Sequence, residues 1–144
     1  MKIDLFVRDS CRLRPGIAGL SENIRVVSIV GRFLEHSRIY YFRNGGDEEY
    51  FIASADAMKR NLEARVEILC PVEAPGLTRE LRAIFDLHAA DRCCAWEMQP
   101  DGSYRQCIPD GEAPCEGIQQ IMIARAKKRL KESLNKKKRP TSER

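Results

Sequence analysis

A histidine and an arginine two positions apart are the first candidates for chemistry in this sequence. His36 and Arg38 stand at the start of an apolar and aromatic run that ends at Phe42. Side chains alternate along a strand, so residues two apart point to the same face. A guanidinium holds phosphate oxygens in a fork, and an imidazole exchanges a proton near neutral pH. The pair suits a phosphoryl group, with a hydrogen-bonded histidine at a strand edge as the plainer alternative.

Arg8 is the second candidate, because it follows an alternating apolar segment. Residues 2–7 predict a strand, and ligands gather beyond the carboxyl ends of strands in an open α/β sheet. A solvated arginine is the plainer interpretation. Asp9 follows directly, and its carboxylate would oppose a phosphate held by Arg8, since like charges repel.

Local patterns predict the elements that must position these residues. Asn44-Gly45-Gly46, between apolar runs at 38–42 and 49–53, predicts a hairpin, because these residues accept positive φ. A second hairpin candidate spans 99–104. The remaining patterns predict a loop over 9–23, strands over 24–30 and 65–72, a short helical turn over 31–36, and helices over 56–63, 76–90 and 117–134.

This order of elements predicts an α/β fold with a mixed sheet flanked by helices. The sheet should have about five strands. We expect one domain over residues 1–134 and a disordered basic tail over 135–144, which has no apolar side chain to offset the entropy cost of ordering.

The positive net charge of the chain comes from its C-terminal end. Residues 125–144 carry ten Lys or Arg and two acidic residues, which leaves fifteen basic and nineteen acidic residues before them. The body is therefore mildly acidic, and we expect no specific nucleic-acid partner. No apolar run is long enough to cross a bilayer, so no transmembrane segment is predicted.

The six cysteines form no Cys-x-x-Cys pair. A zinc site from His88, Cys93, Cys107 and Cys115 fits no common spacing, so free thiols are the preferred interpretation. His88 lies on the apolar face of the helix predicted over 76–90, which indicates a structural histidine. No metal ligand is therefore assigned.

A long, ordered series of blocks resembles the C-terminal catalytic domain of polyphosphate kinase, the family that transfers the terminal phosphate of ATP to polyphosphate. The blocks are residues 3–8, 13–16, 19–25 and 28–42, then Asn44-Gly45-Gly46, Ser54-Ala55-Asp56, Arg60-Asn61 and Arg65-Val66-Glu67. The resemblance implies a phospholipase D-like half-site and reversible phosphoryl transfer through a phosphohistidine. Enzymes of this family are far longer, so the chain resembles a piece of one.

The resemblance also implies roles for particular residues. Arg8 matches the arginine that binds the nucleotide phosphate, and His36 matches the second histidine, which contacts the transferring phosphate. Arg38 matches the second basic residue of an H-x-K-like motif. The nucleophilic histidine of the family lies in a segment that this chain lacks. The polar block that follows the motif corresponds to Ser54, Asp56 and Asn61, with hairpin-end and helix-cap bonding as the alternative.

The same resemblance implies cofactors, partners and location. We expect Mg²⁺ in the full enzyme, and as partners ATP or ADP, inorganic polyphosphate, the missing N-terminal portion and a second copy in a homo-oligomer. The expected location is cytoplasmic, with membrane association as an alternative. Two positions depart from the family pattern: Asp9 replaces a usual glycine and Ala57 a usual tryptophan.

Two alternatives to the kinase remain open at this point. The domain could be a stand-alone module that binds phosphate or polyphosphate without catalysis. It could also be a phospholipase D-like phosphodiesterase half-site, which would need two H-x-K-like motifs, for instance in a dimer. The isolated chain is expected to be inactive as a kinase in each case.

Overall fold

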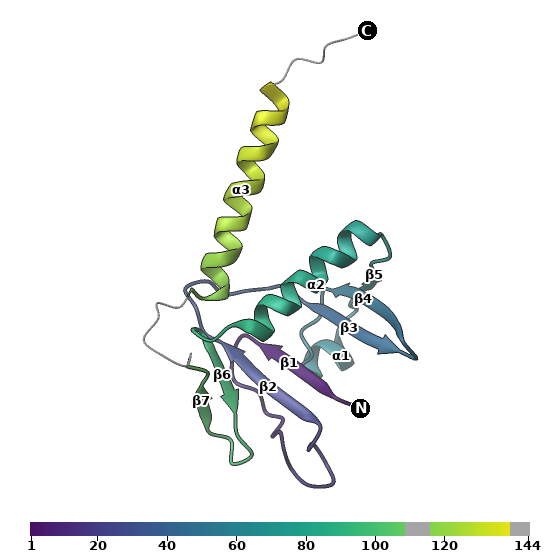
Figure 1. The fold of residues 1–144 in the computed structure, drawn as a ribbon. Helices are drawn as coiled ribbons and strands as arrows, with labels where there is room; N and C mark the ends of the chain where they lie inside the picture. The colour runs from purple at the N-terminus through teal and green to yellow at the C-terminus, as the bar shows by residue number, and fades with distance from the viewer. Residues whose placement is uncertain (109–115, 139–144) are drawn as a thin grey trace. The chain divides into compact units, whose positions relative to one another are not determined.

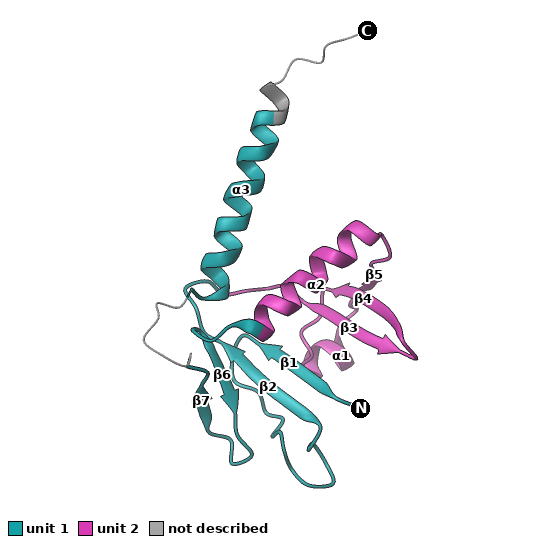
Figure 2. Cartoon of the chain, viewed as in Figure 1, with its two compact units in different colours: residues 1–33, 90–144 teal, residues 34–89 magenta. Residues whose placement is uncertain are grey.

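The computed structural model describes residues 1–108 and 116–138 (Figure 1). The chain forms two compact units, and the single domain expected over 1–134 stays a prediction. Unit 1 comprises Met1–Phe33 with Ala90–Arg144, and unit 2 comprises Leu34–Ala89 (Figure 2). None of the described helices combines the length and the apolar character of a membrane span.

Unit 1 contains a mixed four-stranded sheet in the order β1-β2-β6-β7. β1 runs parallel to β2, and the other neighbours are antiparallel. The strands are β1 (Ile3–Val7), β2 (Ile24–Ile29), β6 (Ala95–Met98) and β7 (Tyr104–Gln106). The apolar core consists largely of side chains from these strands, including Val26, Val27, Ile29, Ala95 and Met98.

Unit 2 is built on an antiparallel three-stranded sheet with the order β3-β4-β5. β3 (Ile39–Asn44) and β4 (Asp47–Ala53) form the predicted hairpin, and β5 (Leu69–Pro71) pairs with β4. Gly45 and Gly46 adopt φ values of 64° and 117°. A two-residue turn with both residues at positive φ matches the twist of the flanking strands, which explains the two glycines.

The helix α2 (Pro75–Ala90) packs on the hairpin of unit 2 through aromatic and ionic contacts. The Tyr41 ring lies 6.0 Å from the Phe85 ring and 5.0 Å from the Tyr50 ring. The Arg82 guanidinium lies 5.5 Å from the Tyr41 ring and 3.1 Å from the Glu48 carboxylate. The helix predicted over 76–90 is thus confirmed and anchored at its middle.

The predicted fold class is confirmed, with two sheets in place of one sheet of about five strands. Both hairpins form where they were expected. Two of the remaining elements are shorter than predicted: α1 spans Lys59–Ala64 and β5 only Leu69–Pro71. The helix α3 (Ile118–Lys138) is longer, so the disorder expected from residue 135 is wrong for residues 135–138, and 139–144 lie outside the described residues.

The helical turn predicted over 31–36 does not form. The backbone N–H of Phe33 donates to the Gln119 side chain at 3.0 Å, and its carbonyl accepts from the same amide at 2.8 Å. The N–H and C=O of Phe33 therefore have hydrogen-bond partners without forming a helix.

A buried carboxylate ties the start of α3 to the turn that precedes β6. Asp91 is 5% exposed, and its Oδ1 accepts hydrogen bonds from the backbone N–H groups of Cys93 and Cys94, both at 2.7 Å. Its Oδ2 accepts from the N–H of Ile118 at 2.8 Å. Helix N-termini leave N–H groups without partners, so this contact both caps α3 and fixes its position in unit 1.

We predict that Asp91→Ala lowers the free energy of unfolding by at least about 2 kcal/mol, because one buried and two part-buried N–H groups lose a charged acceptor. Asp101 provides a matched control: it accepts from the N–H and hydroxyl of Ser103 but is exposed. Asp101→Ala should cost about 1 kcal/mol or less. Urea denaturation measures both, and equal losses would contradict the role of Asp91.

Candidate functional site

Arg8 leaves the carboxyl end of β1 and bonds to the loop that follows β2. Its Nε donates to the carbonyl of Phe33 at 3.1 Å, and its Nη2 donates to the carbonyl of Gly31 at 3.2 Å. These bonds use part of the donor fork, so the guanidinium still has N–H groups to offer to phosphate oxygens. Arg8 thus lies at the end of a strand, as the sequence predicted.

Gln119 clamps the same loop from the first turn of α3. It is 7% exposed and bonds to both backbone groups of Phe33. A Cβ atom added to Gly31 would lie 2.5 Å from Gln119 Oε1. A side chain at 31 would therefore displace the Gln119 amide from Phe33, and the loop is bonded both to Arg8 and to Gln119.

The Asp9 carboxylate is engaged in its own turn. Its Oδ1 accepts from the backbone N–H of Ser10 at 2.7 Å, and the Asp9 carbonyl accepts from the Ser28 hydroxyl at 3.3 Å. Asp9 is exposed. A local hydrogen bond partly offsets the negative charge, but it leaves a carboxylate next to Arg8, as the sequence predicted.

His36 and Arg38 lie together in unit 2, before and at the edge of β3. His36 is exposed, and its backbone carbonyl accepts from Arg38 Nη1 at 3.1 Å. Arg38 Nε donates to Asp56 Oδ1 at 2.7 Å. This hydrogen bond raises the pKa of Arg38 and lowers the pKa of Asp56. Arg38 is therefore fixed by two bonds, one to the His36 backbone and one to a carboxylate.

The residues of the predicted polar block, Ser54, Asp56 and Asn61, make two separate sets of contacts. Ser54 accepts from the N–H of Ile68 at 2.9 Å and donates to Glu67, which is hairpin-end bonding. Asn61 is 2% exposed and hydrogen-bonds toward Asp56, which helps to lower the pKa of that carboxyl. Helix capping does not occur, since the N-cap of α1 is Met58 and has no side-chain bond.

His88 has the structural role that the sequence predicted. Its Nδ1 lies 2.8 Å from the carbonyl of Ile84, and its Nε2 lies 3.6 Å from the Glu35 carboxylate. Within residues 1–108 and 116–138, no three His, Cys, Asp or Glu side chains gather as a metal site. Cys115, the fourth member of the conceivable zinc set, lies outside the described residues.

The prediction of free thiols holds for the cysteines at 11, 70, 94 and 107. Cys93 is disulfide-bonded, so the prediction is wrong for this residue.

The comparison with protein families decides the family. Residues 1–118 match the model described as polyphosphate kinase C-terminal domain 2. The chain belongs to this family.

Relatives in the polyphosphate kinase family are close in sequence and in structure. The polyphosphate kinase of Synechocystis sp. is 53% identical over 88% of this chain, and that of Pseudomonas aeruginosa is 49% identical over 85%. The crystal structure of polyphosphate kinase from Porphyromonas gingivalis superposes with a TM-score of 0.79 at 42% identity, over 92% of this chain and 20% of that one. The chain spans less than a fifth of the two curated relatives, 17% and 18% of their lengths.

The sequence analysis did not identify two residues that position the candidate site of this polyphosphate kinase domain. Asp91, after a predicted helix, carried a recognisable signal, because aspartate in that place often accepts bonds from the next N–H groups. Gln119 carried none: its partner Phe33 is 86 positions away.

We predict that Gly31→Ala and Gln119→Ala are strongly coupled. The methyl group introduced by Gly31→Ala should displace the Gln119 amide and cost about 2 kcal/mol, and Gln119→Ala alone should cost about 1–2 kcal/mol. The double variant should lose at least about 1 kcal/mol less than the sum, because the shortened side chain at position 119 leaves room for the new methyl group. Urea denaturation of all four proteins tests the coupling, and additive losses would contradict it.

We predict that the Asp56 carboxyl titrates at a lower pH in the wild type than in Arg38→Gln. A folded-state pKa below the unfolded value, about 3.9, stabilises the protein above that pH, and the stabilisation is lost as pH falls through the folded-state pKa. Carbon-detected NMR of the Asp56 carboxyl measures both midpoints. Identical midpoints would show that Arg38 does not interact with the carboxylate in solution.

Proposed function

We propose that this chain is the part of a polyphosphate kinase that holds the transferring phosphate, supplying Arg8 and His36 to reversible phosphoryl transfer between ATP and polyphosphate. Membership of the polyphosphate kinase C-terminal domain 2 family carries this proposal. The contacts of Arg8 within unit 1 support it, because they fix a guanidinium at the carboxyl end of a strand. We place the enzyme in the cytoplasm.

Arg8 would act by charge and position. Phosphoryl transfer develops negative charge on the oxygens of the moving group, and a fixed guanidinium stabilises that charge without reorganising. The bonds to the carbonyls of Gly31 and Phe33 pre-orient the side chain, so little rotamer entropy is lost when phosphate binds.

His36 would donate or accept a proton, or a hydrogen bond, at a phosphate oxygen. Its exposure leaves the imidazole accessible to a bound phosphate. Arg38 would serve mainly as a positioning residue, since it bonds to the carbonyl of His36 and to Asp56 at the same time. The phosphate-binding role that we expect for Arg38 would then use the N–H groups outside these two bonds.

The nucleophile would come from another part of the enzyme. In the transfer, the bond from the terminal phosphorus of ATP to its bridging oxygen breaks and a bond to a histidine nitrogen forms; the phosphoryl group then passes to a terminal oxygen of polyphosphate. Of the chain's two histidines, His88 has its Nδ1 at hydrogen-bond distance from the Ile84 carbonyl and its Nε2 near Glu35, and its side chain is 17% exposed, so it is a poor nucleophile. We infer that the isolated chain does not synthesise polyphosphate.

The Mg²⁺ expected in the full enzyme stays a prediction, because no cluster of protein ligands for it stands out within the described residues. Protein-bound Mg²⁺ uses one or two carboxylates together with phosphate oxygens. Asp9 is bonded to its own turn and Asp56 to Arg38, and no three His, Cys, Asp or Glu side chains gather within the described residues. We therefore assign no residue of this chain to the ion and route no step through it.

Among the alternatives, a stand-alone phosphate-binding module would use the same Arg8 and His36 without a nucleophile. A phosphodiesterase would need two H-x-K-like motifs, and one His-x-Arg step occurs in this chain. The two alternatives differ from the kinase in one respect that can be measured, which is the response to the missing portion of the enzyme.

The test is complementation by a separately produced N-terminal portion of a relative that carries the nucleophilic histidine. Mixed with this chain, it should form polyphosphate from ATP, whereas neither part should do so alone. His36→Ala should reduce turnover at least about a hundredfold, as expected for a group that assists proton transfer. His88→Ala is the matched control and should alter stability with little effect on turnover.

A stable complex that turns over equally well with and without His36 would refute the role of His36. Polyphosphate synthesis by this chain alone would refute the division of labour. Hydrolysis of a phosphodiester by this chain alone would favour the phosphodiesterase.

A further inference from the structure

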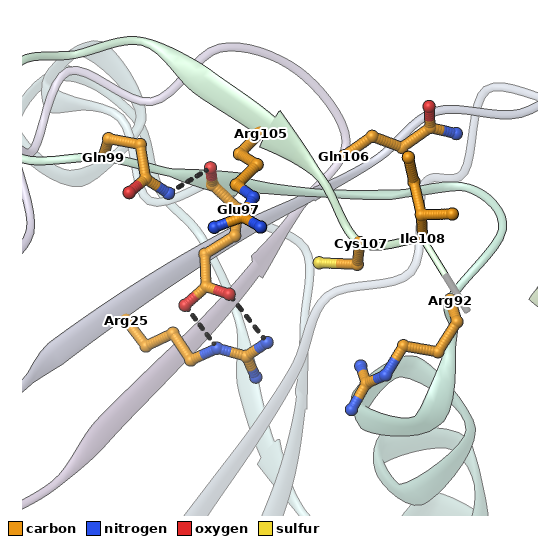
Figure 3. Close-up of a pocket in the computed structure, with 8 residues that line it drawn as sticks. All are labelled: Arg25, Arg92, Glu97, Gln99, Arg105, Gln106, Cys107 and Ile108. Atoms are coloured by element: carbon orange, nitrogen blue, oxygen red, sulfur yellow. Dashed lines mark hydrogen bonds and ion pairs between the residues drawn. The ribbon is translucent and has the colours of Figure 1, made fainter. Parts of the chain in front are cut away.

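An open, arginine-lined cavity of about 420 Å³ lies on unit 1, away from the residues assigned above (Figure 3). It contains no part of Arg8 or its loop. β2 contributes Arg25, β6 contributes Glu97, β7 contributes Arg105 and Gln106, and the turn before β6 contributes Arg92. Gln99, Cys107 and Ile108 complete the lining. Three arginines against one carboxylate give the cavity a net positive charge.

The one carboxylate among the described lining residues, Glu97, is paired with Arg25. Glu97 accepts from Arg25 through both oxygens, Nε to Oε1 at 2.9 Å and Nη2 to Oε2 at 3.4 Å. This fork holds the Arg25 guanidinium rigid and leaves further N–H groups on it. Asp4, a second carboxylate whose charge acts on Arg25, lies 3.4 Å from the Lys2 ammonium. Each of these two carboxylates thus has a cationic partner.

Arg105 supplies a charge that this network does not neutralise. It is exposed, and it forms no ion pair with another described residue. Register places it directly opposite Glu97 on the neighbouring strand, so it stands over the same face as the Arg25–Glu97 pair. Arg92, whose Nη1 donates to the carbonyl of Asp91 at 3.3 Å, lines the cavity from the turn.

The three arginines indicate which kind of ligand the cavity would bind. Arginine forks match the paired oxygens of phosphate, and several of them in one concave site favour an anion with many oxygens. None of the described lining residues has an aromatic ring on which a nucleic-acid base could stack. Inorganic oxyanions therefore fit better than a nucleic acid.

We propose that this arginine-lined cavity is a second binding site for phosphate-class oxyanions, separate from Arg8 and His36. A triphosphate group can come from a short inorganic polyphosphate or from a nucleotide, and both carry the chemistry that the cavity recognises. The proposal stands on the cavity alone and does not depend on the function proposed for Arg8.

The test titrates the ¹⁵N-labelled chain with sodium tripolyphosphate at low salt and follows the amide signals of Gln99, Arg105 and Cys107. These signals should shift and saturate. The double variant R92Q/R105Q should weaken this binding at least about tenfold, since each removes a charged donor. Arg105→Gln alone should weaken this binding severalfold. Because the Arg105 side chain is exposed and pairs with no carboxylate of the described residues, this substitution should not disturb the fold.

The matched control is R43Q/R79Q, which removes the same charge from exposed arginines of unit 2 and should change the affinity less than twofold. Arg8→Gln should leave the three signals unchanged, which separates this site from the proposed phosphate site. ATP in place of tripolyphosphate decides the source: equal shifts indicate any triphosphate, and shifts with tripolyphosphate alone indicate an inorganic chain.

Three results would overturn the proposal: no saturable shift at these amides, equal weakening by R43Q/R79Q, or tighter binding of a single-stranded oligonucleotide than of tripolyphosphate.

Discussion

The buried carboxylate of Asp91 is the interaction on which the arrangement of unit 1 depends. It accepts three backbone N–H groups, and the N–H of Ile118 is one of them, so it fixes the start of α3. The next residue, Gln119, then reaches both backbone groups of Phe33, and the carbonyl of Phe33 also accepts from Arg8. A continuous set of hydrogen bonds thus links a helix start to the guanidinium that we propose as a phosphate ligand.

The elements with local signals could be predicted from the sequence. Gly45 and Gly46 meet a φ requirement that few other residues meet, and the β-branched residues of β2 favour a strand wherever it is placed. Elements that depend on distant partners could not. The turn expected over 31–36 gave way to bonds from Gln119, and the strand expected over 65–72 pairs with β4 only at Leu69–Pro71.

The same division holds for the candidate site. Arg8, His36 and Arg38 were predicted because they follow or begin strands and match a family pattern, and their roles stay a prediction. The ion pair of Arg38 with Asp56 spans 18 positions and was implied only by the polar block. Asp91 and Gln119 reach partners 27 and 86 positions away, and no local pattern specifies such pairs. The arginines of the cavity gather for the same reason, through the pairing of β2, β6 and β7.

The affinity for ATP at low salt, read from the backbone amide of Phe33, tests the central claim most directly. If Arg8 holds the nucleotide phosphate, Arg8→Gln should weaken binding at this amide at least about tenfold. Arg12→Gln, an exposed arginine in the following loop, should change it little, and Asp9→Gly should strengthen it by removing a like charge. Equal affinity in the wild type, Arg8→Gln and Asp9→Gly would contradict the assignment of Arg8.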